Sequence, residues 1–272
     1  MSEQVLTQKK SRIYREVSTV LAIFAREVTV ALKSPGTLIM SLAMPMIMMG
    51  MIGGNLMQNM AGGLGFQFGT FMLVGMLVNM LFMSTTMGVA SLVDDHDSNF
   101  SEEMLIAPVS RYGIVIGKIS GSMFGAVLSM AGTLIVGLMM GITLSLTQLL
   151  LILALSPLIC LSAGALAMIL IGLIQNRKTA NLAVMLITMP QMFLSGAIIP
   201  INHSSGVLLV LSRMMPMTYC LDLVRAVVYR GTPEYSSVVM FDPVVNFAAI
   251  VGLTVICLVI GTFFFARSEK NR

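Results

Sequence analysis

The sequence predicts an all-α integral membrane protein that forms one transmembrane domain over residues 1–272. Hydrophobic residues make up 57% of the chain and charged residues only 10%, whereas a soluble domain carries about 25% charged residues. The mean hydropathy of +0.92 agrees with a largely lipid environment. Six apolar runs have about the 20 residues that a helix needs to cross a bilayer; they cover residues 36–56, 70–93, 114–142, 149–174, 180–199 and 244–266.

Residues 1–35 precede these runs and are expected to form a cytoplasmic N-terminus with an amphipathic helix. Apolar side chains from Ile13 to Leu32 recur on one face at helical spacing, and Arg15, Arg26 and Lys33 fall on the other. This pattern favours an elbow helix in the membrane interface, leading into the first span. A soluble helix packed on a partner is the alternative. The segment lacks the pattern of a cleaved signal peptide.

Residues 36–266 are expected to form a six-span bundle with few polar interruptions. Pro45, Pro157 and Pro190 lie inside runs and should kink the helices. Lys118 is the one ionisable residue within the runs, and we expect it to reach the interface from the start of the third span. Twenty-seven methionines suit either loose helix packing or an adaptable cavity.

The distribution of charge predicts the orientation of the bundle. Lys and Arg are concentrated before the first run, after the fourth run and in the tail, residues 267–272, whereas residues 58–69 and 143–148 carry no charge. Basic residues favour the cytoplasmic side, so both termini are expected in the cytoplasm. The basic residues form no stripe with interleaved aromatic residues, which disfavours a nucleic acid partner.

Catalytic and metal chemistry have little support in the sequence. His96 and His203 are expected on opposite sides of the membrane, and the three cysteines are far apart. Residues 113–120 resemble a phosphate-binding loop but have three residues between the glycines instead of four. We therefore expect no catalytic residue, cofactor or metal in this chain. No Asp, Glu or His lies in mid-span to relay ions, so energy for transport would come from another chain.

Small residues recur every fourth position in the third run, beginning with Gly117, Gly121 and Gly125. Small residues at this spacing allow two helix backbones to approach closely. The stripe predicts a packing ridge within one chain, or alternatively a dimer interface.

A short cytoplasmic helix is expected between the second and third runs. Asn99 can cap it, with Glu102 completing the capping box, and Pro108 ends it. Its apolar side chains need a groove on a cytoplasmic partner. The candidate partner-binding residues are Glu102, Glu103, Met104, Leu105, Ile106, Ala107, Pro108 and Arg111.

The external connection before the last run is expected to hold two short helices. Residues 207–215 are apolar but too short to span, and Pro216 begins a second helix on which Asp222 and Arg225 share a face and are expected to pair. Two such helices would re-enter the outer leaflet. The candidate gate residues are Pro200, Pro216, Tyr219, Asp222 and Arg225.

Residues 102–111, continuing to Gly117 and Lys118, resemble the coupling helix of the type-two ATP-binding-cassette exporter permeases. Residues 193–200, followed by Pro216, Thr218, Tyr219, Asp222 and Arg225, resemble the signature of that family before its last span. The chain departs from the family at 99–101, where Gly-Thr is common, and at 202–205, where a proline-bearing stretch is common.

The resemblance implies a homodimer of this chain in the cell membrane with two ATPase subunits, which bind ATP and Mg²⁺. The coupling helix would dock on the ATPase, the gate would be an external re-entrant pair, and the substrate would pass outward between the permeases. An amphiphilic drug, a peptide, a lipid-linked molecule and a polysaccharide stay open as substrates. An energy-independent channel or scaffold and an intramembrane lipid-modifying enzyme are the competing functions; no regular polar face supports the first, and no buried acid–base pair supports the second.

The orientation can be tested by labelling single cysteines from outside intact cells. A cysteine at Ser205 should react with a membrane-impermeant maleimide, because the connection before the last span is expected to be external. A cysteine at Ser101 should not react. The reverse pattern would contradict the orientation.

Overall fold

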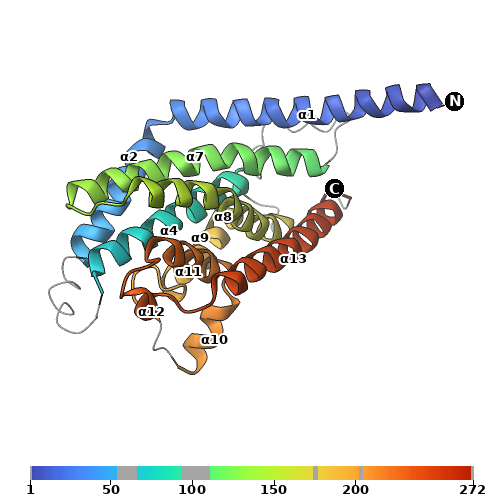
Figure 1. The fold of residues 1–272 in the computed structure, drawn as a ribbon. Helices are drawn as coiled ribbons and strands as arrows, with labels where there is room; N and C mark the ends of the chain where they lie inside the picture. Colours follow the sequence, from blue (N-terminus) through green and yellow to red (C-terminus); the bar gives the residue numbers. More distant parts are fainter. Residues whose placement is uncertain (1, 54–65, 93–110, 174–176, 202–204, 271–272) are drawn as a thin grey trace.

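The computed structural model describes residues 2–53, 66–92, 111–173, 177–201 and 205–270. These residues form helices joined by short connections, with no strand among them (Figure 1). The helices are α1 (Ser2–Lys33), α2 (Pro35–Ile47) with the π-helix η1 (Met48–Gly53), α4 (Phe68–Ala90), α7 (Arg111–Met139), α8 (Leu146–Leu173), α9 (Arg177–Leu194), α10 (Val207–Met214), α11 (Pro216–Val228), α12 (Tyr235–Val238) and α13 (Pro243–Lys270).

Each of the six predicted runs overlaps a helix, but fewer than six helices qualify as spans. Four stretches are long and apolar enough to cross a membrane, and the bent pair α10–α11 would make a fifth if counted as one span. The apolar parts of α2 with η1 and of α9 are shorter, at Leu42–Met51 and Leu182–Leu194. The described part of the chain therefore supports a multi-pass membrane protein with four or five spanning helices.

The two shorter helices fall below spanning length for different reasons. The run that begins in α2 continues toward residue 56, and residues 54–65 lie outside the described part of the chain. The first turn of α9 is polar, with Arg177, Lys178 and Thr179 ahead of its apolar part. The prolines lie inside helices as expected, and the backbone changes to π-helix three residues after Pro45.

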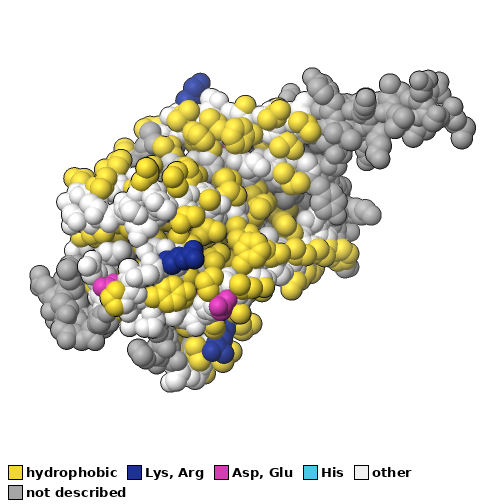
Figure 2. Space-filling view, in the orientation of Figure 1, with side chains coloured by type: hydrophobic (Ala, Val, Ile, Leu, Met, Phe, Trp, Pro, Cys, Tyr) yellow, Lys and Arg dark blue, Asp and Glu magenta, His cyan; other side chains and the backbone are white. Residues whose placement is uncertain are grey.

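Helix α4 lies at the centre of the bundle. It packs against α7, α8, α9 and α11, and Phe71, Val74 and Leu77 are fully buried. Its apolar residues are distributed around the whole helix, as expected for a helix surrounded by protein. Helices α1, α2, α7, α8, α9, α10 and α13 expose apolar side chains, and Figure 2 shows hydrophobic side chains over much of one face with few charged groups. A surface of this kind suits a lipid environment.

Helix α1 runs alongside the first half of α7 (Figure 1). An added Cβ on Gly117 would meet Ile23, one on Gly121 would meet Glu27, and one on Gly125 would meet Ala31. The matching four-residue steps on both helices place these glycines at a contact within the chain. The placement of α1 in the membrane interface stays a prediction.

The structure also corrects the expected position of Lys118. Its side chain is only 2% exposed, and its Nζ lies 2.7 Å from Oε1 of Glu27 on α1. The same carboxylate oxygen accepts a hydrogen bond from Arg26 at 3.2 Å. Lys118 is therefore held inside the protein: α1 supplies a carboxylate where the sequence of the third run alone offered none, and a paired charge can stay buried.

Replacing Gly121 with alanine should weaken the packing of α1 on α7. The new Cβ would lie 2.5 Å from Cβ of Glu27, so the helices must move apart. We expect Gly121→Ala to lower the free energy of unfolding by about 1–3 kcal/mol, the usual effect of overpacking. Gly252→Ala on α13 is the matched control, because no atom lies within 4 Å of its added Cβ. Equal thermal unfolding midpoints for the two purified variants would contradict this contact.

Candidate functional site

Asp222 on α11 is buried, at 2% exposure, and fully engaged. Its Oδ1 accepts a hydrogen bond from the backbone N–H of Met240, and its Oδ2 accepts one from the N–H of Phe241, both at 2.8 Å. The side-chain amide of Asn246, in the first turn of α13, donates to Oδ2 at 2.8 Å. Hydrogen bonds to an ionised carboxylate are stronger than neutral ones. Asp222 thus fastens α11 to the start of α13.

Arg225, one turn further along α11, is 1% exposed and makes different contacts. Its Nη2 donates to the carbonyl oxygen of Gly196 at 2.7 Å, just beyond the end of α9. Its guanidinium carbon lies 3.7 Å from the ring centroid of Phe71 on α4, a cation–π arrangement that suits a desolvated cation. Gly196 has a φ of +82°, a conformation that favours glycine. Arg225 thus fastens α11 to α9 and α4.

Asp222 and Arg225 do not form the direct ion pair expected from their spacing. Both residues are described, yet their hydrogen bonds go to separate partners on different elements. The reason lies in the neighbouring connections. Asp222 meets backbone N–H groups of the connection that leads into α13, whereas Arg225 meets a backbone carbonyl of the connection that follows α9.

Helices α10 and α11 meet at Met215 with a bend of 83°, a geometry common to broken spans and re-entrant loops. The hydroxyl of Thr218 donates to the carbonyl of Ser212 at 2.6 Å, and that of Tyr219 donates to the carbonyl of Arg213 at 2.7 Å. Pro216 begins α11, where a missing N–H costs nothing. The two hydroxyls satisfy carbonyls at the end of α10, which holds the bend. Helix α11 is mostly buried, whereas α10 exposes apolar side chains. Pro200, also predicted for the gate, follows α9 and is half-buried.

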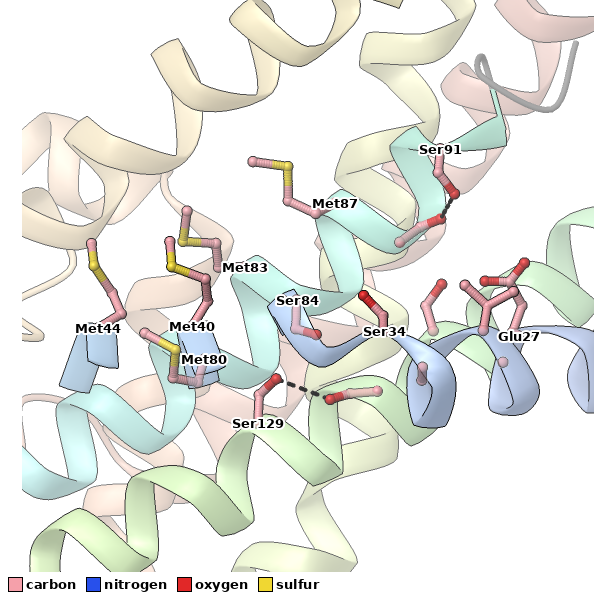
Figure 3. A pocket seen from close by; sticks show the side chains of 17 residues that line it. Glu27, Ser34, Met40, Met44, Met80, Met83, Ser84, Met87, Ser91 and Ser129 are labelled. Atoms are coloured by element: carbon pink, nitrogen blue, oxygen red, sulfur yellow. Dashed lines mark hydrogen bonds between the residues drawn. The ribbon is translucent and has the colours of Figure 1, made fainter. Parts of the chain in front are cut away.

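A cavity of about 650 Å³ lies between α1, α2, α4 and α7 (Figure 3). Five methionines line it: Met40, Met44, Met80, Met83 and Met87. Five serines also line it: Ser34, Ser84, Ser91, Ser122 and Ser129. Glu27 is the one charged residue in the described part of the lining. The spacing of the methionines is a signal that could have indicated this cavity, since methionines recur about every third or fourth position in both the first and second runs.

The remaining predicted site residues are placed only in part. Residues 102–108, the core of the expected coupling helix, lie outside the described residues, and Arg111 begins α7. Among the described residues, no group of three or more His, Cys, Asp or Glu side chains could hold a metal. Phe71, Gly196 and Asn246, which contact the charged residues of α11, were not predicted, because their proximity depends on tertiary packing.

Comparison with known proteins gives one match. A family model described as ABC-2 type transporter matches residues 18–229. The matched region runs from within α1 to just beyond the end of α11. No curated protein matches the chain.

The contacts of α11 predict which side chains depend on one another. Asp222→Ala should leave three donors without their acceptor, each costing about 1–3 kcal/mol, and should impair stability. In double-mutant cycles, the coupling of Asp222 to Asn246 should be larger than its coupling to Arg225, because only the first pair is in direct contact. The free energy of unfolding in mixed micelles measures both cycles. A coupling energy between Asp222 and Arg225 that exceeds the one between Asp222 and Asn246 would contradict this arrangement and indicate a direct ion pair.

Proposed function

The chain belongs to the ABC-2 type transporter family, and we propose that it is the membrane-spanning permease subunit of an ATP-driven exporter. The observation that carries the proposal is the extent of the family match, which covers residues 18–229 and so includes most of the helical bundle. The apolar, multi-pass architecture of the described residues agrees with such a role.

ATP hydrolysis is proposed to take place on a separate ATPase subunit, which would bind ATP and Mg²⁺. The sequence of this chain offers no phosphate-binding loop with the required spacing. The proposed contact with the ATPase is the segment 97–111, which connects α4 to α7. Because α4 and α7 pack side by side, movement of this segment would be transmitted directly to two helices of the bundle.

The proposed orientation places both termini and the α4–α7 connection in the cytoplasm. In Figure 1, the start of α7 and the end of α13 lie toward the same end of the bundle, which supports a shared side for these segments. Helices α10 and α11 would then face outward, with α11 fixed in the bundle and α10 dipping its apolar side chains into the outer leaflet.

We propose that two copies of the chain assemble with two ATPase subunits in the cell membrane and that the substrate passes outward between them. The proposal of a dimer rests on the resemblance of residues 102–118 and 193–225 to the exporter permeases. An amphiphilic drug, a peptide, a lipid-linked molecule or a polysaccharide would be consistent with the family.

The coupling role of residues 102–108 can be tested with a double substitution. Met104→Asp/Leu105→Asp should release the ATPase or uncouple its hydrolysis from export, because both apolar side chains are proposed to fill a groove on the partner. Co-purification of the ATPase and ATP-dependent export measure the two effects.

Asn99→Asp/Ser101→Asp is the matched control, since it adds the same charge to the same segment and keeps the apolar side chains. Thermal unfolding of the isolated chain should be unchanged in both variants. Normal export and normal recovery of the complex with Met104→Asp/Leu105→Asp would contradict the proposed contact.

A further inference from the structure

The cavity between α1, α2, α4 and α7 has a polar end and an apolar end. Glu27 and Ser91 lie toward one end, and Met40, Met44 and Met80 gather toward the other (Figure 3). The chain order agrees with the view, since the lining residues of α1 and α2 run from Glu27 to Met44 and those of antiparallel α4 run from Ser91 back to Met80. An amphiphilic molecule would therefore have one orientation in this cavity.

The polar end offers hydrogen-bond acceptors. Ser91 and Ser122 donate their hydroxyl hydrogens to backbone carbonyls of their own helices, at 2.8 and 2.7 Å. Ser129, which lies nearer the methionines in Figure 3, does the same at 3.0 Å. A hydroxyl has one hydrogen and two lone pairs, so each of these oxygens is left able to accept a hydrogen bond. Helical backbone donors are already used within the helices.

The charge at the cavity also favours a ligand that donates hydrogen bonds. Among the described lining residues, Glu27 is the only charged one and no side chain carries an N–H group. The cations that contact Glu27, Arg26 and Lys118, are not among the lining residues. A phosphate or carboxylate would find no charged donor here, whereas an ammonium or another N–H group would find a carboxylate and hydroxyl oxygens.

The apolar end suits a variable hydrophobic body. Methionine side chains are flexible and polarizable, and they adapt to ligands of different shape. The volume of about 650 Å³ falls within the range of small-molecule sites, about 300–1,000 Å³. It is far larger than a single ion requires.

From these observations we infer that the cavity binds a cationic amphiphile with N–H donors, its amine end at Glu27 and Ser91 and its apolar body among the methionines. The inference that this cavity binds such a ligand does not depend on the proposed function. The further step, that the ligand is the substrate of an exporter, rests on the proposed function. Ser91 lies at the end of α4 and Gly121, which meets Glu27, lies ten residues into α7. The polar end of the cavity is therefore the end nearer the side that the proposed orientation makes cytoplasmic, and the ligand would enter from the inner leaflet.

The test uses the full chain in nanodiscs of neutral phosphatidylcholine, with rhodamine 6G as the probe. This dye is an apolar cation with N–H donors, and its fluorescence anisotropy should rise saturably above the signal of empty nanodiscs. The anionic amphiphile 1-anilinonaphthalene-8-sulfonate should not bind saturably. Glu27→Gln should weaken rhodamine 6G binding about tenfold, the effect of losing one charge-assisted hydrogen bond. Asp242→Asn removes an exposed carboxylate outside the cavity and should leave binding unchanged.

Gly125→Leu tests the space itself. An added Cβ on Gly125 would lie 3.8 Å from Cβ of Ala31, an ordinary contact, and the rest of the leucine would occupy the cavity that Gly125 lines. Binding should be lost, whereas Gly252→Leu, at a glycine with no atom near its added Cβ, should bind normally. Thermal unfolding of each variant shows whether a loss of binding is due to misfolding. If Gly125→Leu does not fold, the binding affinity of Glu27→Gln tests the inference.

Three results would overturn the inference: no saturable binding, equal binding of the cationic and anionic dyes, or unchanged binding in both Glu27→Gln and Gly125→Leu. A change in oligomeric state with Gly125→Leu, without rhodamine 6G binding to the unaltered chain, would assign the cavity to a second copy instead. Because the assay needs neither ATP nor a partner, its failure is distinguishable from failure of the export function, which is measured by ATP-dependent export.

Discussion

Two buried charges on α11 determine how the bundle is closed at its proposed outer end. A charge removed from water is tolerated only where partners replace its hydration, and Asp222 and Arg225 each find partners on different elements. Asp222 accepts hydrogen bonds from residues at and just before the start of α13. Arg225 donates a hydrogen bond just beyond the end of α9 and contacts the ring of Phe71 on α4. Since α4 is the central helix, α11 is connected to the interior of the bundle as well as to its rim. The bend at Met215 then directs α10 away from this fixed point.

The ion pair of Lys118 and Glu27 connects α7 to α1, in the N-terminal half of the chain. Lys118 is buried against Glu27, next to glycines that allow α1 to approach α7 closely. Helix α1 packs closely on α7 at these glycines. The cavity lies beside this contact, between α1, α2, α4 and α7. The carboxylate of Glu27 therefore has two consequences: it stabilises the packing of α1 on α7, and it places a charged group in the wall of the cavity.

The sequence predicted the helices well and their contacts poorly, for physical reasons that differ between residues. The apolar runs at 70–93 and 149–174 end close to the bounds of α4 and α8, because polar and charged residues bound the runs. The pairing of Asp222 with Arg225 was wrong, because spacing on a helix reveals which side chains share a face but not which loops lie opposite. Lys118 was misplaced for the same reason, since its partner is 91 residues away. The methionine cavity needed the register of four helices, which no single run contains.

The hydrogen bonds of Asp222 also bear on the order in which the protein is made. All three donors, on Met240, Phe241 and Asn246, follow Asp222 in the chain and lie beyond the region matched by the family model, which ends at residue 229. During synthesis α11 leaves the ribosome before these donors exist, and domains acquire structure from the N-terminus onward. Until residues 240–246 arrive, the carboxylate must stay hydrated or protonated, so α11 cannot settle into the bundle. Translation of residues 240–246 therefore completes the set of partners of Asp222, and a chain that stops short of them leaves this carboxylate without its three donors.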